Sequence, residues 1–119
     1  MSLLLAGRIV VADLRDALPK EPNKIRPCVI VEDSDLFDPD YPNVIVVPLT
    51  TDTSFVIQEL AVEIPPTPAN GCTSTSYAVA HSVVTISKQR IGKETPSSVT
   101  DEQLALIRRR IAESVGFVP

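Results

Sequence analysis

Residues 24–31, KIRPCVIV, and residues 44–51, VIVVPLTT, are two strongly apolar runs, and each carries polar residues at one end. β-Branched residues dominate both runs, which is typical of buried strands. An arginine stands directly before the proline of the first run, and two threonines close the second. Two buried strands are therefore predicted to deliver polar groups to their ends.

Further strands are predicted on both sides of these two runs. They are residues 8–14, RIVVADL, residues 59–64, ELAVEI, which alternate polar and apolar side chains, and residues 77–87, bent near His81 and Ser82. The segments between them are charged or rich in proline and are predicted to be loops. Five or six short strands without helices between them indicate a mainly β fold, a small barrel or a sandwich.

A single helix is predicted at the C-terminal end of the chain. The sequence TDEQ forms a capping box in which Thr100 and Gln103 each bind the other's backbone N–H. Gly116 is expected to cap the other end, and residues 108–110, three arginines, are interpreted as a solvated helix end. One apolar stripe is expected to face the core, formed by Leu104, Ile107, Ile111 and Val115.

The charge of the chain argues against binding nucleic acid over its whole surface. The formal net charge is −4. Residues 1–64 hold five Lys and Arg against eleven Asp and Glu, whereas residues 65–119 hold six against four. Because a polyanion is attracted by clustered positive charge, any such site has to be a local patch.

Composition and cysteine spacing set the remaining expectations. The 119 residues fit one domain over residues 1–119. Cys28 and Cys72 show neither CxxC nor Cys/His spacing, which predicts reduced thiols and neither a metal site nor another cofactor. The N-terminal MSLLLAG lacks the basic segment of a signal peptide, and no apolar run reaches membrane-spanning length. A cytoplasmic protein without membrane association is predicted.

Four motifs succeed one another over residues 7–116, with a characteristic order and spacing. They are GRIVVADL at residues 7–14, a glutamate five residues before Arg-Pro at residues 21–27, PLTT at residues 48–51, and SYAVAHSVVTISKQR at residues 76–90. Together they resemble the MazF/PemK family of toxin endoribonucleases from toxin–antitoxin pairs. The resemblance implies an SH3-like barrel with a C-terminal helix, the CcdB/MazF/PemK-like fold, which agrees with the strands and helix predicted above.

The resemblance also implies a catalytic pair, Arg26 and Thr50, that converges on the scissile phosphate of single-stranded RNA. Attack of a ribose 2′-OH on the adjacent phosphorus needs no metal and leaves a 2′,3′-cyclic phosphate and a 5′-OH. A guanidinium forks onto two oxygens of the phosphorane, which a lysine cannot match. A hydroxyl completes the anion site, and one such donor typically lowers the barrier by roughly 3 kcal/mol.

Proton transfer has two candidate residues. Glu21 matches a loop glutamate near the active site of the family and is placed to accept the 2′-OH proton. His81 stands where the family has Asp, and Ser82 follows where the family has Gln. An imidazole titrates near neutrality and is suited to acid or base catalysis, although a structural, hydrogen-bonded histidine is the favoured alternative.

Further polar residues within or beside the motifs are expected to contact RNA. They are Thr51, Lys24, Thr85, Lys88 and Arg90. Val84 departs from the family, which often has a basic residue there.

The resemblance implies three partners: single-stranded RNA as substrate, a cognate antitoxin protein, and a second copy of the chain in a homodimer. Two alternatives remain open. One is a non-catalytic barrel that binds a protein, as the CcdB toxins bind DNA gyrase, and the other is a degenerate family member with a structural or regulatory role. Retention of Arg26 and Thr50 favours the nuclease.

Overall fold

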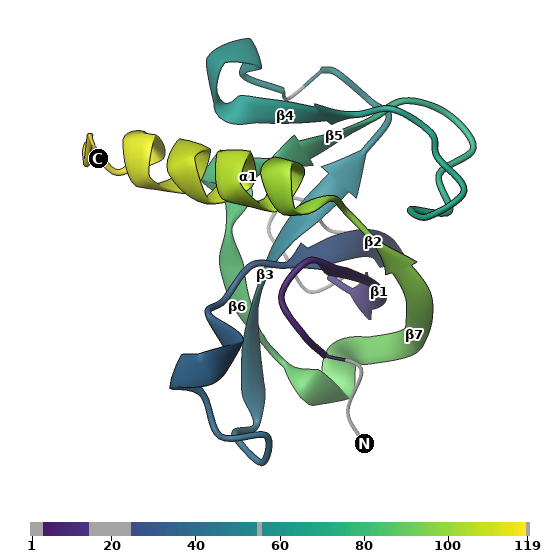
Figure 1. Cartoon of the computed structure of the whole chain (residues 1–119), viewed down its shortest axis with the longest axis vertical. Coiled ribbons are helices and arrows are strands. Elements are labelled where there is room, and N and C mark those ends of the chain that lie inside the picture. The colour runs from purple at the N-terminus through teal and green to yellow at the C-terminus, as the bar shows by residue number, and fades with distance from the viewer. Residues whose placement is uncertain (1–3, 15–24, 55, 119) are drawn as a thin grey trace.

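The computed structural model describes residues 4–14, 25–54 and 56–118. In these residues, seven antiparallel strands form a curved sheet, and one α-helix lies across it near the C-terminus (Figure 1). The strands are β1 (Arg8–Asp13), β2 (Ile25–Ile30), β3 (Asn43–Thr50), β4 (Ala61–Ile64), β5 (Ser76–Val79), β6 (Val84–Ser87) and β7 (Ile91–Ser98), and the helix is α1 (Asp101–Ser114). The predicted mainly β fold with a C-terminal helix is confirmed.

The strand β3 joins the two halves of the sheet, whose order is β4-β5-β3-β2-β1-β7. One edge of β3 pairs with β2, and the other pairs first with β6 and then with β5. Between β5 and β6 the chain makes a short 3-10 turn, η3 (Ala80–Ser82). The single bent strand predicted over residues 77–87 is therefore two strands, because the two parts pair with β3 in different registers.

Both faces of the sheet are covered by apolar side chains, which explains why the central strands are apolar without interruption. Alternate residues of a strand point to opposite faces. One buried cluster packs under α1 and includes Ile9, Val29, Val31, Val47, Leu49, Val62, Ile64, Leu104 and Ile107. The cluster on the opposite face includes Val10, Ala12, Leu14, Cys28, Ile30, Val44, Val46 and Ile86.

The start of α1 agrees with the prediction in detail. Thr100 is the N-cap residue, its hydroxyl accepts a hydrogen bond from the Gln103 N–H at 3.0 Å, and the Gln103 side chain accepts one from the Thr100 N–H at 2.9 Å. Arg108 is exposed, as predicted for a solvated helix end, but its guanidinium also donates to the carbonyl oxygens of Val31 at 2.9 Å and Glu32 at 2.8 Å. These two bonds attach the helix to the end of β2.

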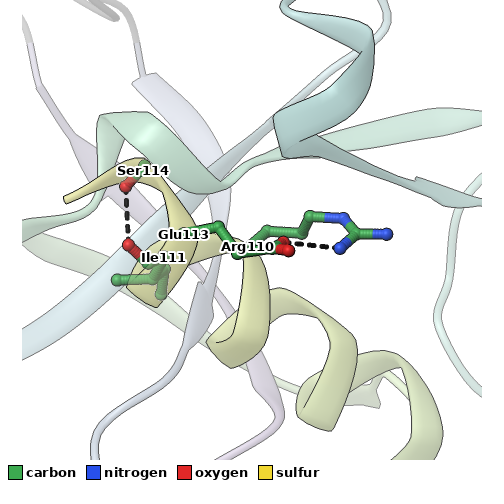
Figure 2. A network of polar contacts seen from close by, with 4 residues as sticks. All are labelled: Arg110, Ile111, Glu113 and Ser114. Atoms are coloured by element: carbon green, nitrogen blue, oxygen red, sulfur yellow. Dashed lines mark hydrogen bonds and ion pairs between the residues drawn. The ribbon is translucent and has the colours of Figure 1, made fainter. Parts of the chain in front are cut away.

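The end of α1 differs from the predicted apolar stripe. Val115 is the C-cap residue and is 76% exposed, because the helix extends past the sheet that it covers. Gly116 follows with a φ of 87°, and its N–H donates to the Glu113 carbonyl oxygen at 3.0 Å. Figure 2 shows the last turn, where Arg110 pairs with Glu113 and the Ser114 hydroxyl donates to the Ile111 carbonyl oxygen.

One strand was not predicted, and the strand predicted over residues 59–64 is shorter, because residues Gln58–Leu60 form a 3-10 turn before β4. The sequence of β7, IGKETPSS, contains glycine and proline and is largely exposed, so neither alternation nor apolarity indicated a strand there. The strand β2 begins two residues before Pro27. The missing N–H of that proline does not interrupt the pairing of β2 with β3, because the first pair of that ladder is Cys28 with Pro48. No helix among the described residues is long and apolar enough to cross a lipid bilayer.

Candidate active site

Arg26 lies near the start of β2, on the side of the strand that also carries Cys28. Its partner across the β1–β2 ladder is the fully buried Ala12, and Arg26 itself is half-buried. The Nε atom of the guanidinium is buried and has no hydrogen-bond partner among the described residues. A buried donor without an acceptor costs free energy, so this position favours a ligand that brings an acceptor.

Thr50 is the last residue of β3, and its hydroxyl belongs to a tight turn. Its Oγ1 accepts a hydrogen bond from the Asp52 N–H at 3.0 Å and lies 3.4 Å from the Asp52 carbonyl oxygen. The Asp52 carboxylate in turn accepts a hydrogen bond from the Ser54 N–H at 2.9 Å. A distance of 3.4 Å is long for a hydroxyl donor, so the Thr50 proton is held weakly and can be given to a better acceptor.

The strand register brings Arg26 and Thr50 to the same end of the β2–β3 pair, two residues beyond its last paired position. The last β2–β3 pair is Cys28 with Pro48, and two further residues along each strand lead to Arg26 and Thr50. Residues two apart share a face of a sheet, so both side chains lie on the face opposite α1. The β2–β3 ladder ends at Cys28 and Pro48, so the register gives the face that Arg26 and Thr50 share and the end of the strands at which both lie.

The same row continues onto two residues that the sequence did not single out. Thr50 pairs with Tyr77 of β5, and Tyr77 pairs with Glu63 of β4. We call Arg26, Thr50, Tyr77 and Glu63 the polar row. The alternation in ELAVEI indicated that Glu63 is exposed, but only the pairing of distant strands shows that it lies in line with Thr50.

Cys28 follows Arg26 by two residues on the same face of β2, and its thiol is unreactive at neutral pH. Burial raises the pKa of its thiol to about 12, and the positive charge of Arg26 opposes part of that rise. The thiol donates a weak hydrogen bond to the Arg26 carbonyl oxygen at 3.7 Å. Since the thiolate is the reactive form of cysteine, Cys28 provides no nucleophile at neutral pH.

A family model for PemK-like, MazF-like toxins of type II toxin-antitoxin systems matches residues 5–115. The chain belongs to this toxin family. The resemblance predicted from the four motifs is thereby confirmed. A search of curated protein sequences finds no match.

Solved structures of an endoribonuclease and of MazF toxins share the fold of this family member. An endoribonuclease from a mycobacterial species, solved in complex with its cognate antitoxin, is 22% identical, with a TM-score of 0.71 and coverage of 94% of each chain. The toxin MazF-mt6 of Mycobacterium tuberculosis is 20% identical, with a TM-score of 0.70 and coverage of 92% of this chain and 97% of its own. MazF from Deinococcus radiodurans is 15% identical, with a TM-score of 0.77 and coverage of 95% of this chain and 96% of its own.

The predicted RNA contacts of this toxin chain fall at different places in the fold. Thr51 is exposed and follows β3 directly, next to the polar row. Arg90 donates to the Asp13 carbonyl oxygen at 3.0 Å. Asp13 is the last residue of β1 and pairs with Ile25, the first residue of β2. Thr85 is exposed in the middle of β6. Lys88 follows β6 and lies near the start of β3, where its Nζ donates to the carbonyl oxygen of Pro39 at 3.0 Å. The structure therefore brings two of these residues toward Arg26 and leaves Thr85 and Lys88 farther along β3.

His81 lies outside the polar row. It belongs to η3, which packs against α1, and three residues separate it from Tyr77. Its side chain is half-buried, and its Nδ1 is buried without a hydrogen-bond partner among the described residues. The hydrogen bond expected of a structural histidine is therefore not made by this nitrogen, and both the structural and the catalytic role of His81 stay predictions.

Two predicted site residues, Glu21 and Lys24, lie outside the described residues. Within residues 4–14, 25–54 and 56–118, no three His, Cys, Asp or Glu side chains form a group that could hold a metal ion. Cys28 and Cys72 are free thiols that pack against opposite faces of the sheet.

Proposed function

We propose that this chain is an endoribonuclease toxin that cleaves single-stranded RNA without a metal ion. The observation that carries the proposal is that Arg26 and Thr50 lie on one face at the same end of the β2–β3 pair, and that the buried Nε of Arg26 has no acceptor among the described residues. Membership of the MazF-like toxin family and the solved endoribonucleases of the same fold support it.

The proposed reaction uses this pair to stabilise charge. The ribose 2′-oxygen forms a bond to the adjacent phosphorus, and the bond from phosphorus to the 5′-oxygen of the next nucleotide breaks. Arg26 binds two phosphorane oxygens through its planar guanidinium, and Thr50 donates its hydroxyl proton to the same group. A base removes the 2′-OH proton, the leaving 5′-oxygen gains one, and the products are a 2′,3′-cyclic phosphate and a 5′-OH. Glu21 and His81 are the candidates for these proton transfers.

We further propose that the toxin acts as a homodimer and is inhibited by a cognate antitoxin. The mycobacterial relative was solved with its antitoxin, which supports such a partner for this chain. An acidic antitoxin segment would compete with RNA for the donors of the polar row. RNA and antitoxin should therefore exclude one another, and light scattering at micromolar concentration should show a dimer. Independent binding of both ligands, or a monomer, would contradict these two proposals.

The decisive experiment incubates the purified protein with a mixed RNA in excess EDTA and identifies the ends of the fragments. Cleavage should persist and should leave 2′,3′-cyclic phosphate and 5′-OH ends. An Arg26→Ala protein purified in parallel controls for contaminating ribonucleases. Cleavage that stops on chelation and returns with Mg²⁺ would overturn metal independence. A protein that leaves RNA intact but inhibits DNA gyrase would favour the non-catalytic alternative.

A further inference from the structure

Tyr77 occupies the position next to the proposed catalytic pair. It is half-buried in β5, directly opposite Thr50 on one side and Glu63 on the other. Directly opposite residues of antiparallel strands have Cβ atoms about 4.5–5.5 Å apart. The ring therefore lies one strand beyond the hydroxyl that is proposed to bind the phosphate.

The charges around Tyr77 indicate what its ring can bind. A phosphate is attracted toward Arg26, whereas the carboxylate of Glu63 disfavours a second phosphate on the far side of the ring. A nucleobase carries no charge, has a flat face and has N–H donors at its edge that a carboxylate accepts. A base attached to the nucleotide held at Arg26 is therefore the part of RNA that fits beside Tyr77.

The other described aromatic side chains are placed elsewhere. Phe37 and Tyr41 pack against one another, with ring centroids 5.8 Å apart, in the loop before β3. Phe117 lies beyond the end of α1 and is 63% exposed. Within the part of the chain that the structure describes, Tyr77 is the aromatic residue that lies beside the catalytic pair.

We propose that Tyr77 stacks on a base next to the scissile phosphate and so forms a nucleotide subsite of this toxin. Proteins that bind single-stranded RNA use aromatic rings in this way, because every base offers a flat face. This inference rests on the proposed ribonuclease function and adds a residue that binds the substrate without taking part in proton transfer.

The kinetic test compares two substitutions of the same residue. Tyr77→Phe keeps the ring and should cleave RNA like the wild type. Tyr77→Val keeps a β-branched side chain suited to a strand but removes the ring, so KM should rise about tenfold or more while kcat changes little. An unchanged KM in a folded Tyr77→Val protein would overturn the subsite. Wild-type protein that does not cleave RNA at all would instead refute the proposed function.

A fluorescence test reports stacking directly and does not require cleavage. The chain has two tyrosines and no tryptophan, so Tyr41→Phe leaves Tyr77 as the only fluorescent tyrosine, and Tyr77→Phe leaves Tyr41 as the matched control. The probe is a single-stranded oligonucleotide with 2′-O-methyl riboses, which cannot be cut. Saturation should quench the emission of the Tyr41→Phe protein by about half or more, because a base stacks on the remaining ring, and should leave the control unchanged after correction for absorption. Equal responses, or no response from Tyr77, would overturn the proposal even if Tyr77→Val failed to fold.

An abasic substitution then locates the stacked base. Two 2′-O-methyl probes lack the base on the 5′ or the 3′ side of the mapped cleavage site. One of the two should lose the quenching of Tyr77, and the other should keep it. Full quenching by both probes would show that no base beside the cut stacks on Tyr77.

Discussion

The two ends of β3 differ in the polar groups that surround them, although they belong to one apolar strand. The strand begins at Asn43, after a loop whose exposed carboxylates include Asp33, Asp35, Asp38 and Asp40. Near that end, Lys88 already donates its ammonium group to the carbonyl oxygen of Pro39. The strand ends at Thr50, beside Arg26, whose buried Nε lacks an acceptor among the described residues.

This difference indicates how a chain with a net charge of −4 can bind RNA. The seven steps from one end of β3 to the other span about 23 Å, which is more than two Debye lengths at 0.1 M salt. The acidic loop therefore repels a phosphate at the Thr50 end only weakly. A polyanion is expected to approach the end with Arg26 and to avoid the end with the four carboxylates.

Of the substitutions at the two ends of β3, Arg26→Lys should change the cleavage rate most. The lysine keeps the positive charge but cannot form two parallel bonds to the phosphorane oxygens. The cleavage rate should fall by about a thousandfold, whereas RNA binding should weaken only a few-fold. Single-turnover cleavage and binding of 2′-O-methyl RNA measure the two effects separately. Near-normal cleavage by a folded Arg26→Lys protein would remove the central residue of the site.

Thr50→Ala should lower the cleavage rate less than Arg26→Lys does, and Thr51→Ala is its matched control. Thr50 points along the polar row, whereas Thr51 is the next residue of the chain and is exposed. Loss of one hydroxyl donor should lower the cleavage rate by about a hundredfold, and the neighbouring substitution should lower it less than about threefold. Equal losses in the two variants would mean that the turn after β3, and not the hydroxyl of Thr50, matters for the rate.

Parts of the fold that depend on local sequence were predictable. The capping box of α1 lies within four adjacent residues, so Thr100 and Gln103 identify it without knowledge of the rest of the fold. Arg26 and Thr50 stand at the ends of strands whose apolarity is evident in the sequence. The exposed Val115 was predicted to be buried because helical periodicity continues past the point where the sheet beneath α1 ends.

Features that depend on pairing between distant segments were not predictable. Tyr77 and Glu63 join the row of Thr50 only because β3, β5 and β4 pair in one register. Nothing in a single sequence gives that register. The exposed strand β7 lacks the alternation that marks a half-buried strand, so its position is set by its pairing with β1.

Neutralising the acidic loop should have a modest effect that depends on the length of the RNA. Asp35→Asn with Asp40→Asn removes two exposed charges and leaves in place the side-chain caps made by Asp33 and Asp38. At low salt, an RNA long enough to pass the loop should bind a few-fold more tightly, whereas a four-nucleotide RNA should bind as before. Equal gains for both lengths would show that the two ends of β3 are not electrostatically separate.

His81→Asn should have the smallest effect, because His81 lies in η3 and not in the polar row. An acid or base histidine contributes on the order of 10²–10⁴-fold to a rate, whereas a packed histidine contributes through stability. We expect cleavage like that of the wild type, with a lower melting temperature if the imidazole fills space that asparagine leaves open. The pH dependence of kcat, measured beside the melting temperature, distinguishes the two roles. A loss of more than about a hundredfold in rate at an unchanged melting temperature would place proton transfer on His81, and the site would then extend from the end of β3 to the turn beneath α1.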